Sequence, residues 1–368
     1  MSETGEALVS NRSALEEIHQ RLGAAMIERD GWSIPASYGD VLLEYASVRE
    51  SGAGLIDLSS RGRLLVSGSE AVQFLNGLIT NDMKTLAENQ WMPAVFPTVQ
   101  GRLIASVRVI HRADGFLIDT EASTHERVLQ TISRFTLAGD FRVTDLTTEL
   151  TQFSLQGTRA AEIVARVLGE AAARLVHFEV AIVPWQQGQV TVIRASQTGA
   201  DGFDLFVAAN QAAALWEALT AAGARPVGFD AVEILRIEAG QPRYRIDMDE
   251  SNVVTETNLD EAISYTKGCY IGQEIVARIK YRGHVAKKLT GILFSRGVKI
   301  QSGPSIRSLD DKEIGRITSA TLSPHLGRTV ALGYVKYDYL AAGTEVKVVA
   351  GERELYAEVV ELPFVHKV

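Results

Sequence analysis

The sequence predicts a mixed α+β protein that ends in a small antiparallel β-barrel. Short β-rich runs alternate with helical candidates from about residue 55 to residue 239. Beyond residue 286 the chain changes to short strands separated by Gly, Pro and Ser, a pattern typical of a barrel or sandwich. The length of 368 residues exceeds what one ordinary core holds, so we expect two or three domains.

The N-terminal part is predicted to begin with one amphipathic helix. Its apolar residues recur at helical spacing and are Leu15, Ile18, Leu22 and Met26. We expect this helix to end near Gly31, so that residues 1–31 form a helical extension packed on the main body. The elements expected next are a strand at 63–67, a helix at about 69–79, a strand at 103–110 and a helix at about 121–136.

The middle of the chain continues the alternation of helices and strands. The expected elements are a helix at about 158–169, strands near 174–183, 189–195 and 203–207, and helices at about 210–222 and 229–239. Asp230 lies at the start of the last of these helices, and we predict that its carboxylate caps it. In the C-terminal part, 291–294 and 345–349 are expected barrel strands.

Charge and composition argue against several classes of function. The net charge of −8 disfavours bulk binding to nucleic acid or to an acidic membrane, because both require a surplus of Lys and Arg. A single cysteine excludes an internal disulfide and fits a reducing compartment. The acidic, polar first six residues do not resemble a signal peptide, and no run of about twenty apolar residues occurs. We therefore expect a cytoplasmic protein with no membrane partner and no direct nucleic-acid partner.

The one cysteine, Cys269, is the strongest candidate for a functional residue. It lies in the run Lys-Gly-Cys-Tyr-Ile-Gly-Gln-Glu at 267–274, two residues after Lys267 and close to the expected start of a helix. A nearby cation and unpaired amide N–H groups both lower the pKa of a thiol. Glu274 opposes thiolate formation, so the direction of the net shift stays open. Burial as a small apolar side chain is the alternative.

Several stretches from about Trp32 to Phe364 resemble the folate-binding aminomethyltransferase fold of the glycine-cleavage T-proteins. The stretches that carry this resemblance are 31–39, 54–59, 199–204, 235–240 and 315–320. The run at 267–274 is similar to the Lys-Gly-Cys-Tyr-x-Gly-Gln-Glu motif that marks the YgfZ branch of this fold and that T-proteins lack. The sequence is therefore identified as most similar to the YgfZ family.

The resemblance implies an architecture and a ligand. It implies two interleaved α+β domains of the folate-binding type over residues 32–285 and a β-barrel domain over 286–368, arranged around a central channel. T-proteins bind tetrahydrofolate in this channel, so the resemblance implies tetrahydrofolate as a ligand here. The positions that it implies as folate contacts are Asp201, Phe203, Arg236, Gln273 and Arg278. It implies no metal site.

Three departures from the T-protein pattern argue against aminomethyl transfer. T-proteins place an aspartate near the folate N10 atom, and the resemblance aligns Ala105 with it. An alanine cannot orient or electrostatically assist an amine. Ala200 stands where T-proteins carry the glutamate that holds the pterin, and Val232 stands where they carry an arginine. Enzymatic activity therefore stays an open question for this chain.

The thiol of Cys269 then becomes the main candidate for chemistry, and Cys269 and Lys267 form the candidate catalytic pair. The YgfZ branch is associated with assembly or repair of iron–sulfur enzymes and, through one of them, with tRNA modification. One cysteine cannot supply the four thiolates that usually hold a cluster, so the resemblance favours an accessory factor whose partners are iron–sulfur client enzymes or assembly proteins. The alternatives are a tetrahydrofolate-dependent aminomethyltransferase or other one-carbon transferase, and a cysteine hydrolase with His284 as base.

Overall fold

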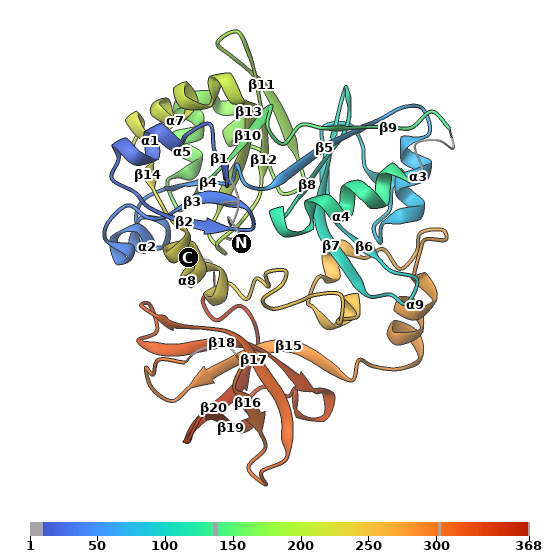
Figure 1. Cartoon of the computed structure of the whole chain (residues 1–368), viewed down its shortest axis with the longest axis vertical. Helices are drawn as coiled ribbons and strands as arrows, with labels where there is room; N and C mark the ends of the chain where they lie inside the picture. The colour runs from blue at the N-terminus through green and yellow to red at the C-terminus, as the bar shows by residue number, and fades with distance from the viewer. Residues whose placement is uncertain (1–9, 135–138, 301–302, 367–368) are drawn as a thin grey trace, which may run out of the picture.

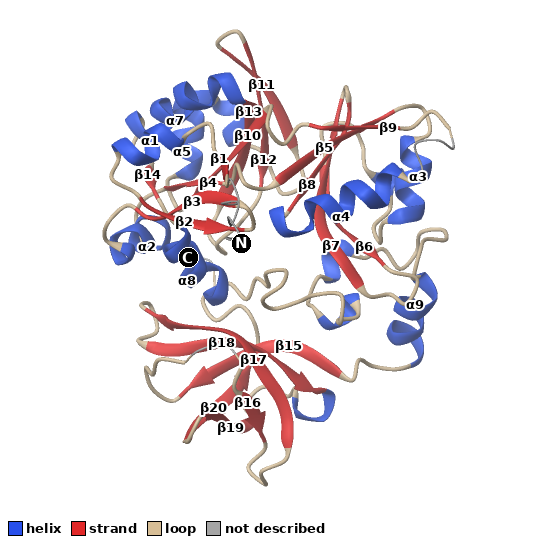
Figure 2. Ribbon diagram, viewed as in Figure 1, coloured by secondary structure: helices blue, strands red, loops and turns tan. Residues whose placement is uncertain are grey.

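The computed structural model describes residues 10–134, 139–300 and 303–366. Two α+β units lie side by side, and a β-barrel lies beneath them both (Figure 1). Helices cover the sheets of the two upper units, whereas the lower unit consists almost entirely of strands (Figure 2). The predicted mixed α+β class and the C-terminal antiparallel barrel are both confirmed. Within the described residues, no helix is long and apolar enough to cross a membrane.

The first unit is built on a six-stranded sheet in the order β11-β12-β13-β10-β4-β14. Its strands are β4 (Gly54–Asp57), β10 (Leu150–Gln156), β11 (Val180–Trp185), β12 (Gly188–Arg194), β13 (Gly202–Ala208) and β14 (Arg225–Pro226). Its covering helices are α1 (Glu16–Arg21), α5 (Ala160–Leu168), α6 (Glu170–Ala173) and α7 (Ala212–Ala221). One apolar cluster joins sheet and helices, with Phe153, Phe203 and Trp216 at its centre.

The second unit is built on a five-stranded antiparallel sheet in the order β6-β7-β8-β5-β9. Its strands are β5 (Gly62–Ser67), β6 (Trp91–Pro97), β7 (Leu103–Arg112), β8 (Gly115–Thr120) and β9 (Arg142–Asp145), and its helices are α3 (Ala71–Leu78) and α4 (Ala122–Ser133). The whole segment from β5 to β9 lies in sequence between β4 and β10 of the first unit. The chain therefore leaves the first sheet, builds the second and returns.

The expectation of one helix from Leu15 to Gly31 is wrong beyond Arg21. The chain turns at Gly23, where φ is +71°, and Ala25–Arg29 forms strand β2, which pairs with β3 (Trp32–Ser37). Asp30 and Gly31 both have positive φ and make the two-residue turn between them, as Asp-Gly pairs do in tight hairpins. β1 (Asn11–Arg12) completes this small sheet.

Helix α8 (Phe229–Glu238) begins without the predicted carboxylate cap. Its N-cap residue is Gly228, and Asp230 lies inside the first turn. A Cβ atom at Gly228 would lie 2.3 Å from the carbonyl oxygen of Ala36 in β3, so only glycine lets the helix start this close to the small sheet. Helix α2 (Val41–Arg49) packs on the other side of α8. The prediction failed because tertiary contact, not capping, sets this helix start.

The C-terminal unit is a closed barrel of six antiparallel strands around its own apolar core. Its strands are β15 (Lys287–Phe294), β16 (Ser305–Arg307), β17 (Glu313–Ser323), β18 (Arg328–Lys336), β19 (Glu345–Ala350) and β20 (Arg353–Val360). The short 3₁₀ helices of the described chain are η1 (Met83–Thr85), η2 (Ala209–Gln211), η3 (Val254–Glu256), η4 (Asp260–Ala262) and η5 (Tyr337–Tyr339).

Three buried hydrogen bonds attach the barrel to the body of the molecule. Ser323 donates to Glu238 (2.5 Å) and Arg236 donates to Ser319 (2.8 Å), which joins α8 to β17. Thr318 donates to Asp247 at 2.6 Å. Each bond has a carboxylate or a guanidinium on one side, and hydrogen bonds to charged groups are stronger than neutral ones. The barrel is therefore held by polar contacts as well as by apolar packing.

Helix α9 (Gln273–Arg282) follows the loop that carries Cys269. Gly272 precedes it in the left-handed conformation, with φ +78°. A Cβ atom there would lie 2.3 Å from the carbonyl oxygen of Thr98, in the turn between β6 and β7. The amide of Ile271 also donates to Gly77 at the end of α3 (3.0 Å). The loop is therefore fixed to the outer end of the second unit.

Candidate functional site

A cavity of about 180 Å³ lies where the two α+β units and helix α8 meet. Its walls come from segments that are far apart in sequence. The apolar wall residues are Ile34, Pro35, Ile56, Leu58, Ala122, Val227, Phe229, Val232 and Pro242, and the charged ones are Arg29, Asp30, Asp57, Arg61, Glu121, Arg236 and Arg243. An apolar hollow edged by a few charged groups is the usual form of a small-molecule site.

Ala105 does not face this cavity. It is fully buried in the core of the second unit, together with Val107 and Val109 on the same face of β7. Side chains alternate across a strand, so Ser106 and Arg108 point the other way, toward the first unit. Ala105 therefore does not face the cavity, although its alignment with the T-protein aspartate implied that it would, and Ser106 lies on the opposite face of β7. Neither residue carries a carboxylate.

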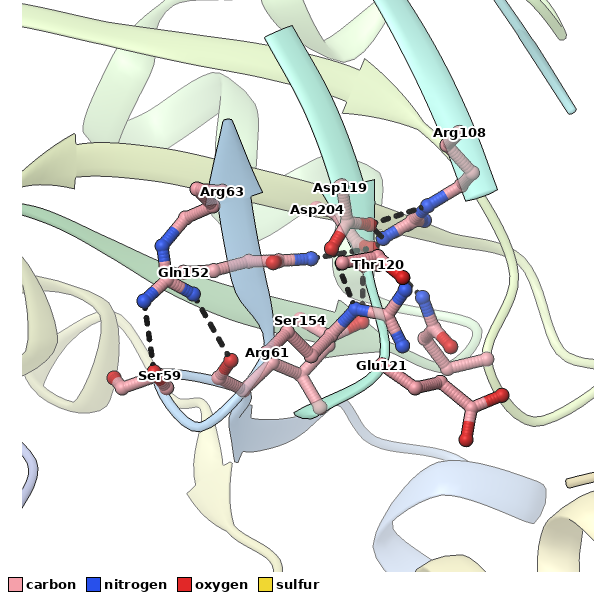
Figure 3. Close-up of polar contacts among 12 residues, drawn as sticks. Ser59, Arg61, Arg63, Arg108, Asp119, Thr120, Glu121, Gln152, Ser154 and Asp204 are labelled. Carbon is pink, nitrogen blue, oxygen red and sulfur yellow. Dashed lines mark hydrogen bonds and ion pairs between the residues drawn. The ribbon is translucent and has the colours of Figure 1, made fainter. Parts of the chain in front are cut away.

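A buried charge network joins the two α+β units beside the cavity (Figure 3). Arg108 of β7 contacts Asp119 of β8 and reaches Asp204 of β13 at 2.6 Å, and Arg61 donates to Asp119 at 2.6 Å. Burial by itself raises the pKa of Asp119, but Arg108 and Arg61 outweigh burial and hold that pKa below its ordinary value. Asp204 also accepts from Ser154 (2.5 Å). The network fixes the two sheets relative to each other.

Arg236, an expected folate contact, lines the cavity, but its guanidinium is occupied by protein partners. Its Nε and Nη2 donate to Glu233 (2.8 Å each), and its Nη1 donates to Asp247 (2.7 Å). Further bonds reach the carbonyl of Gln241 (3.1 Å) and the hydroxyl of Ser319. A guanidinium has five N–H groups, and all are accounted for by these five bonds. Arg236 therefore shapes the cavity wall and has no donor left for a ligand.

Two of the predicted folate contacts lie away from the cavity. Phe203 is fully buried in the core of the first unit, under Arg194, whose Cζ lies 5.4 Å from the ring centroid. Asp201 forms a two-pronged ion pair with Arg194 at 3.0 and 2.6 Å. Neither residue is among the cavity walls. The geometry gives Asp201 a structural partner in place of a pterin.

Lys267 holds the end of a helix, not a thiolate. Its ammonium donates to the carbonyls of Asn76 (2.7 Å), Ile79 (2.9 Å) and Asn81 (2.6 Å), at and just beyond the C-terminus of α3. The last carbonyls of a helix lack partners within the helix and attract a cation. Burial lowers the pKa of Lys267 to about 8. Because all three N–H groups are engaged, the predicted pairing with the Cys269 sulfur is wrong.

Cys269 is exposed, whereas Tyr270 beside it is buried. Gln273 donates to the backbone carbonyl of Lys267 at 3.4 Å, and Arg278 is exposed on α9. None of the residues from 267 to 278 is a wall of the cavity. The predicted placement of the sulfur at the rim of the folate channel, and of Gln273 and Arg278 as folate contacts, therefore finds no support in the geometry.

The other chemistry considered for this loop also lacks a site. His284 stacks on Tyr337, with ring centroids 3.7 Å apart, and its Nδ1 lies 3.0 Å from the carbonyl oxygen of Val285. These contacts do not make it a base for Cys269. In the part of the chain that the structure describes, no group of three or more His, Cys, Asp or Glu side chains is placed to hold a metal ion.

Several cavity residues were missed by the sequence analysis. They include Arg29, Asp57, Arg61, Phe229 and Arg243. Asp57 accepts hydrogen bonds from Ser13 (2.7 Å) and Ser59 (2.8 Å), and its carboxylate lies 2.9 Å from His19. These partners satisfy it, so it supports the cavity floor. Apart from Asp57, which lies in the 54–59 stretch, no motif marks these residues, because they come together only through the fold.

The fold and its matches to family models identify the family. Residues 15–267 match the model of the GCVT N-terminal domain, and residues 287–366 match the glycine cleavage T-protein C-terminal barrel domain. The chain belongs to the glycine cleavage T-protein family. The match to the barrel domain agrees with the closed six-stranded barrel of this chain.

Named members of the T-protein family cover nearly the whole chain. The aminomethyltransferase of Symbiobacterium thermophilum is 34% identical over 367 residues, covering 96% of each chain. That of Rubrobacter xylanophilus is 32% identical over 355 residues, covering 96% of this chain and 94% of its own. The crystal structure of the glycine cleavage system aminomethyltransferase T from Bartonella henselae superposes with a TM-score of 0.89 at 24% identity, covering 96% of this chain and 98% of that one. This last likeness concerns the fold.

Proposed function

We propose that this T-protein family member is a YgfZ-like accessory protein that supports iron–sulfur enzymes through Cys269. It binds a reduced folate in the central cavity and does not transfer an aminomethyl group. The exposed thiol carries the proposal. It stands on a loop that Lys267 anchors to α3 through three hydrogen bonds. An exposed sulfur on a loop anchored in this way is available to a partner protein.

The cavity supports the folate part of the proposal. Its walls combine apolar side chains, on which a flat ring system packs, with charged groups at the edge. Gln197 and the apolar Val232 both line it. Reduced folate is the ligand expected from family membership, and residues such as Ile56, Phe229 and Gln197 would hold it. The folate carries the one-carbon and pterin chemistry when it is bound.

The missing carboxylate supports the loss of aminomethyl transfer. Neither Ala105 nor its neighbour Ser106 on β7 has a carboxyl group, and the hydroxyl of Ser106 cannot carry a full negative charge at neutral pH. The nearby carboxylates Asp119 and Asp204 are already paired with Arg108. A general base or charge stabiliser for an amine is therefore lacking on this strand.

The thiol supports an accessory role and not a resident cluster. One cysteine supplies one thiolate, whereas a cluster usually takes four. Any cluster contact would therefore be shared with a client enzyme or an assembly protein, and effects on tRNA modification would be indirect. Such thiol chemistry requires a reducing compartment, so the proposal places the chain in the cytoplasm.

Complementation tests the accessory role. In cells that lack the endogenous counterpart, Cys269→Ala should abolish recovery of iron–sulfur enzyme activity while the melting temperature stays unchanged, because the exposed sulfur adds little to packing. Thr266→Ala, at an exposed position on the same loop, is the matched control and should complement fully. Full recovery with Cys269→Ala would contradict the proposal.

Aminomethyl transfer is the second candidate function, because the named relatives are aminomethyltransferases. A single-turnover assay with tetrahydrofolate and an aminomethyl donor separates the two candidates. We expect no methylene transfer by the wild type. Transfer that Ser106→Ala leaves intact would favour the second candidate and would show that the reaction needs no group at this position.

A further inference from the structure

Two arginines at one edge of the cavity, Arg29 and Arg243, stack on the same aromatic ring. The Cζ atoms of Arg29 and Arg243 lie 4.4 and 4.6 Å from the centre of the same aromatic ring, that of Phe229. All three residues line the cavity. Arg29 comes from strand β2 and Phe229 from the first turn of α8, so the fold brings this group together from separate segments.

The guanidinium groups of this pair are incompletely satisfied. Within the described chain, the carboxylate nearest to Arg29 is that of Asp30, at 3.8 Å from its Nε, which is too long for a hydrogen bond. Arg243 is in ion-pair contact with Glu233 through its Nη1 atom, but the geometry does not form a hydrogen bond, and Glu233 is its only ion-pair partner among the described residues. Arg236, in the same cavity, shows the contrast because five bonds occupy its five donors.

Arg236 and Arg243 share one carboxylate, so the negative charge available to Arg243 is smaller still. Glu233 is the partner of both Arg236 and Arg243, and it gives its two best-aligned bonds to Arg236. Burial lowers the pKa of Arg243 to about 10, and Glu233 only partly offsets that effect. A buried cation that lacks full compensation gains from an incoming anion. The planar fork of a guanidinium matches a carboxylate in two-pronged geometry.

We propose that Arg29 and Arg243, stacked on Phe229, form an anion subsite of the cavity that binds the glutamyl carboxylate of a bound reduced folate. This inference rests on the proposed folate-binding function and adds the end of the ligand that is recognised. The apolar walls near Ile56 and Val232 then take the ring system, and the arginine pair fixes which end of the ligand lies at β2. The pair binds the tail and takes no part in bond making.

Calorimetric titration of the full-length protein tests the subsite with two probes. One probe is 5-formyltetrahydrofolate, a stable reduced folate with a glutamyl tail, and the other is 6-methyltetrahydropterin, which has the ring system but no carboxylate. The wild type should bind the folate at least tenfold more tightly than the pterin. The double variant Arg29→Gln/Arg243→Gln should lose at least tenfold in folate affinity and keep the pterin affinity.

Single variants separate binding from folding. Arg29 is about one-third exposed, so Arg29→Gln should fold normally and lose part of the folate affinity, and Arg29→Lys should keep more of it than Arg29→Gln. Arg21→Gln, on the surface of α1, is the matched control and should bind both probes as the wild type does.

The outcomes distinguish the two proposals. Equal wild-type affinity for folate and pterin, or unchanged folate affinity in the double variant, overturns the arginine subsite and leaves folate binding standing. A wild type that binds neither probe overturns both. Selective loss of folate affinity in the arginine variants, with pterin affinity intact, supports the subsite.

Discussion

The central cavity and the Cys269 loop differ in how their residues are assembled. The cavity takes its walls from β2, β3, β4, α8 and several loops, and its charged groups are partly buried. The loop at 267–272 is one continuous segment whose sulfur lies in solvent. A substitution in the cavity alters contacts with many neighbouring residues, whereas a substitution at Cys269 alters few. Ligand binding and thiol chemistry can therefore vary separately in this fold.

The two regions are nevertheless attached to the same unit. The Cys269 loop is fixed to the end of α3 and to the turn between β6 and β7, and β7 continues into the charge network beside the cavity. The following changes test how strongly each region depends on the second unit, in order of decreasing expected effect.

The largest effect is expected from Arg108→Met. This change leaves Asp119 and Asp204 buried without their shared cation, and breaking one partner of a buried ion pair costs about 3–5 kcal/mol. Urea unfolding should show the loss, and folate affinity should fall with it. Arg142→Met removes an exposed ion pair of the same unit and should leave stability unchanged within error. Equal stability of the two variants would mean that the network does not hold the sheets together.

Lowering the pH should destabilise the folded chain through the same charge network. The pKa of Asp119 lies below its ordinary value in the folded chain because Arg108 and Arg61 outweigh burial. A depressed carboxyl pKa contributes stability that is present above the unfolded value of about 3.9 and is lost as pH falls through the folded value. The melting temperature should therefore fall steeply below about pH 4. It should fall less steeply in Asp119→Asn, and parallel profiles would contradict this assignment.

Lys267→Met should have an intermediate effect that is confined to stability. Three carbonyls near the end of α3 lose a charged donor, which costs about 2 kcal/mol or more. The rate at which Cys269 reacts with a small disulfide reagent should not change, because Lys267 does not contact the sulfur. Thermal unfolding and thiol kinetics on the same sample measure both quantities. A large drop in the rate at which the Cys269 thiol reacts would show that Lys267 does act on the sulfur electrostatically.

Cys269→Ser should have the smallest effect on the folded chain. The sulfur is exposed, so the melting temperature should stay within error of the wild type. The native wild type should react with one equivalent of a small disulfide reagent without denaturant, and the variant with none. A thiol that reacts only after unfolding would place the sulfur in the interior.

The sequence predicted most elements because their periodicity is local. The helices at 212–221 and 229–238 and the strand at 202–208 lie close to their expected ranges. The predicted N-terminal helix was too long because Leu22 and Met26 keep helical spacing across the turn at Gly23, where the chain leaves the helix. The sequence did not predict which face of β7 the Ala105 side chain occupies. A shift of one residue in register moves a side chain to the opposite face of its strand.

The candidate site was predicted less well than the fold. The motif at 267–274 could be seen in the sequence because it is continuous, and the structure leaves its cysteine exposed. Arg236 lines the cavity, but three of the five acceptors around it, on Gln241, Asp247 and Ser319, lie outside its helix and are brought close only by the tertiary structure. Phe203 and Asp201 were misplaced because their contacts depend on strand pairing. Phe203 packs in the core beside the sheet, and Asp201 pairs with Arg194.

The polar bonds between α8 and strand β17 bear on how the molecule melts. If the barrel detached alone, Glu238, Arg236 and Asp247 would each lose a buried hydroxyl partner at the surface left behind. That cost discourages any state in which one part is unfolded and the other intact. Heating should accordingly produce a single calorimetric endotherm, and a chain shortened before Lys287 should be recovered from cells mainly as aggregate.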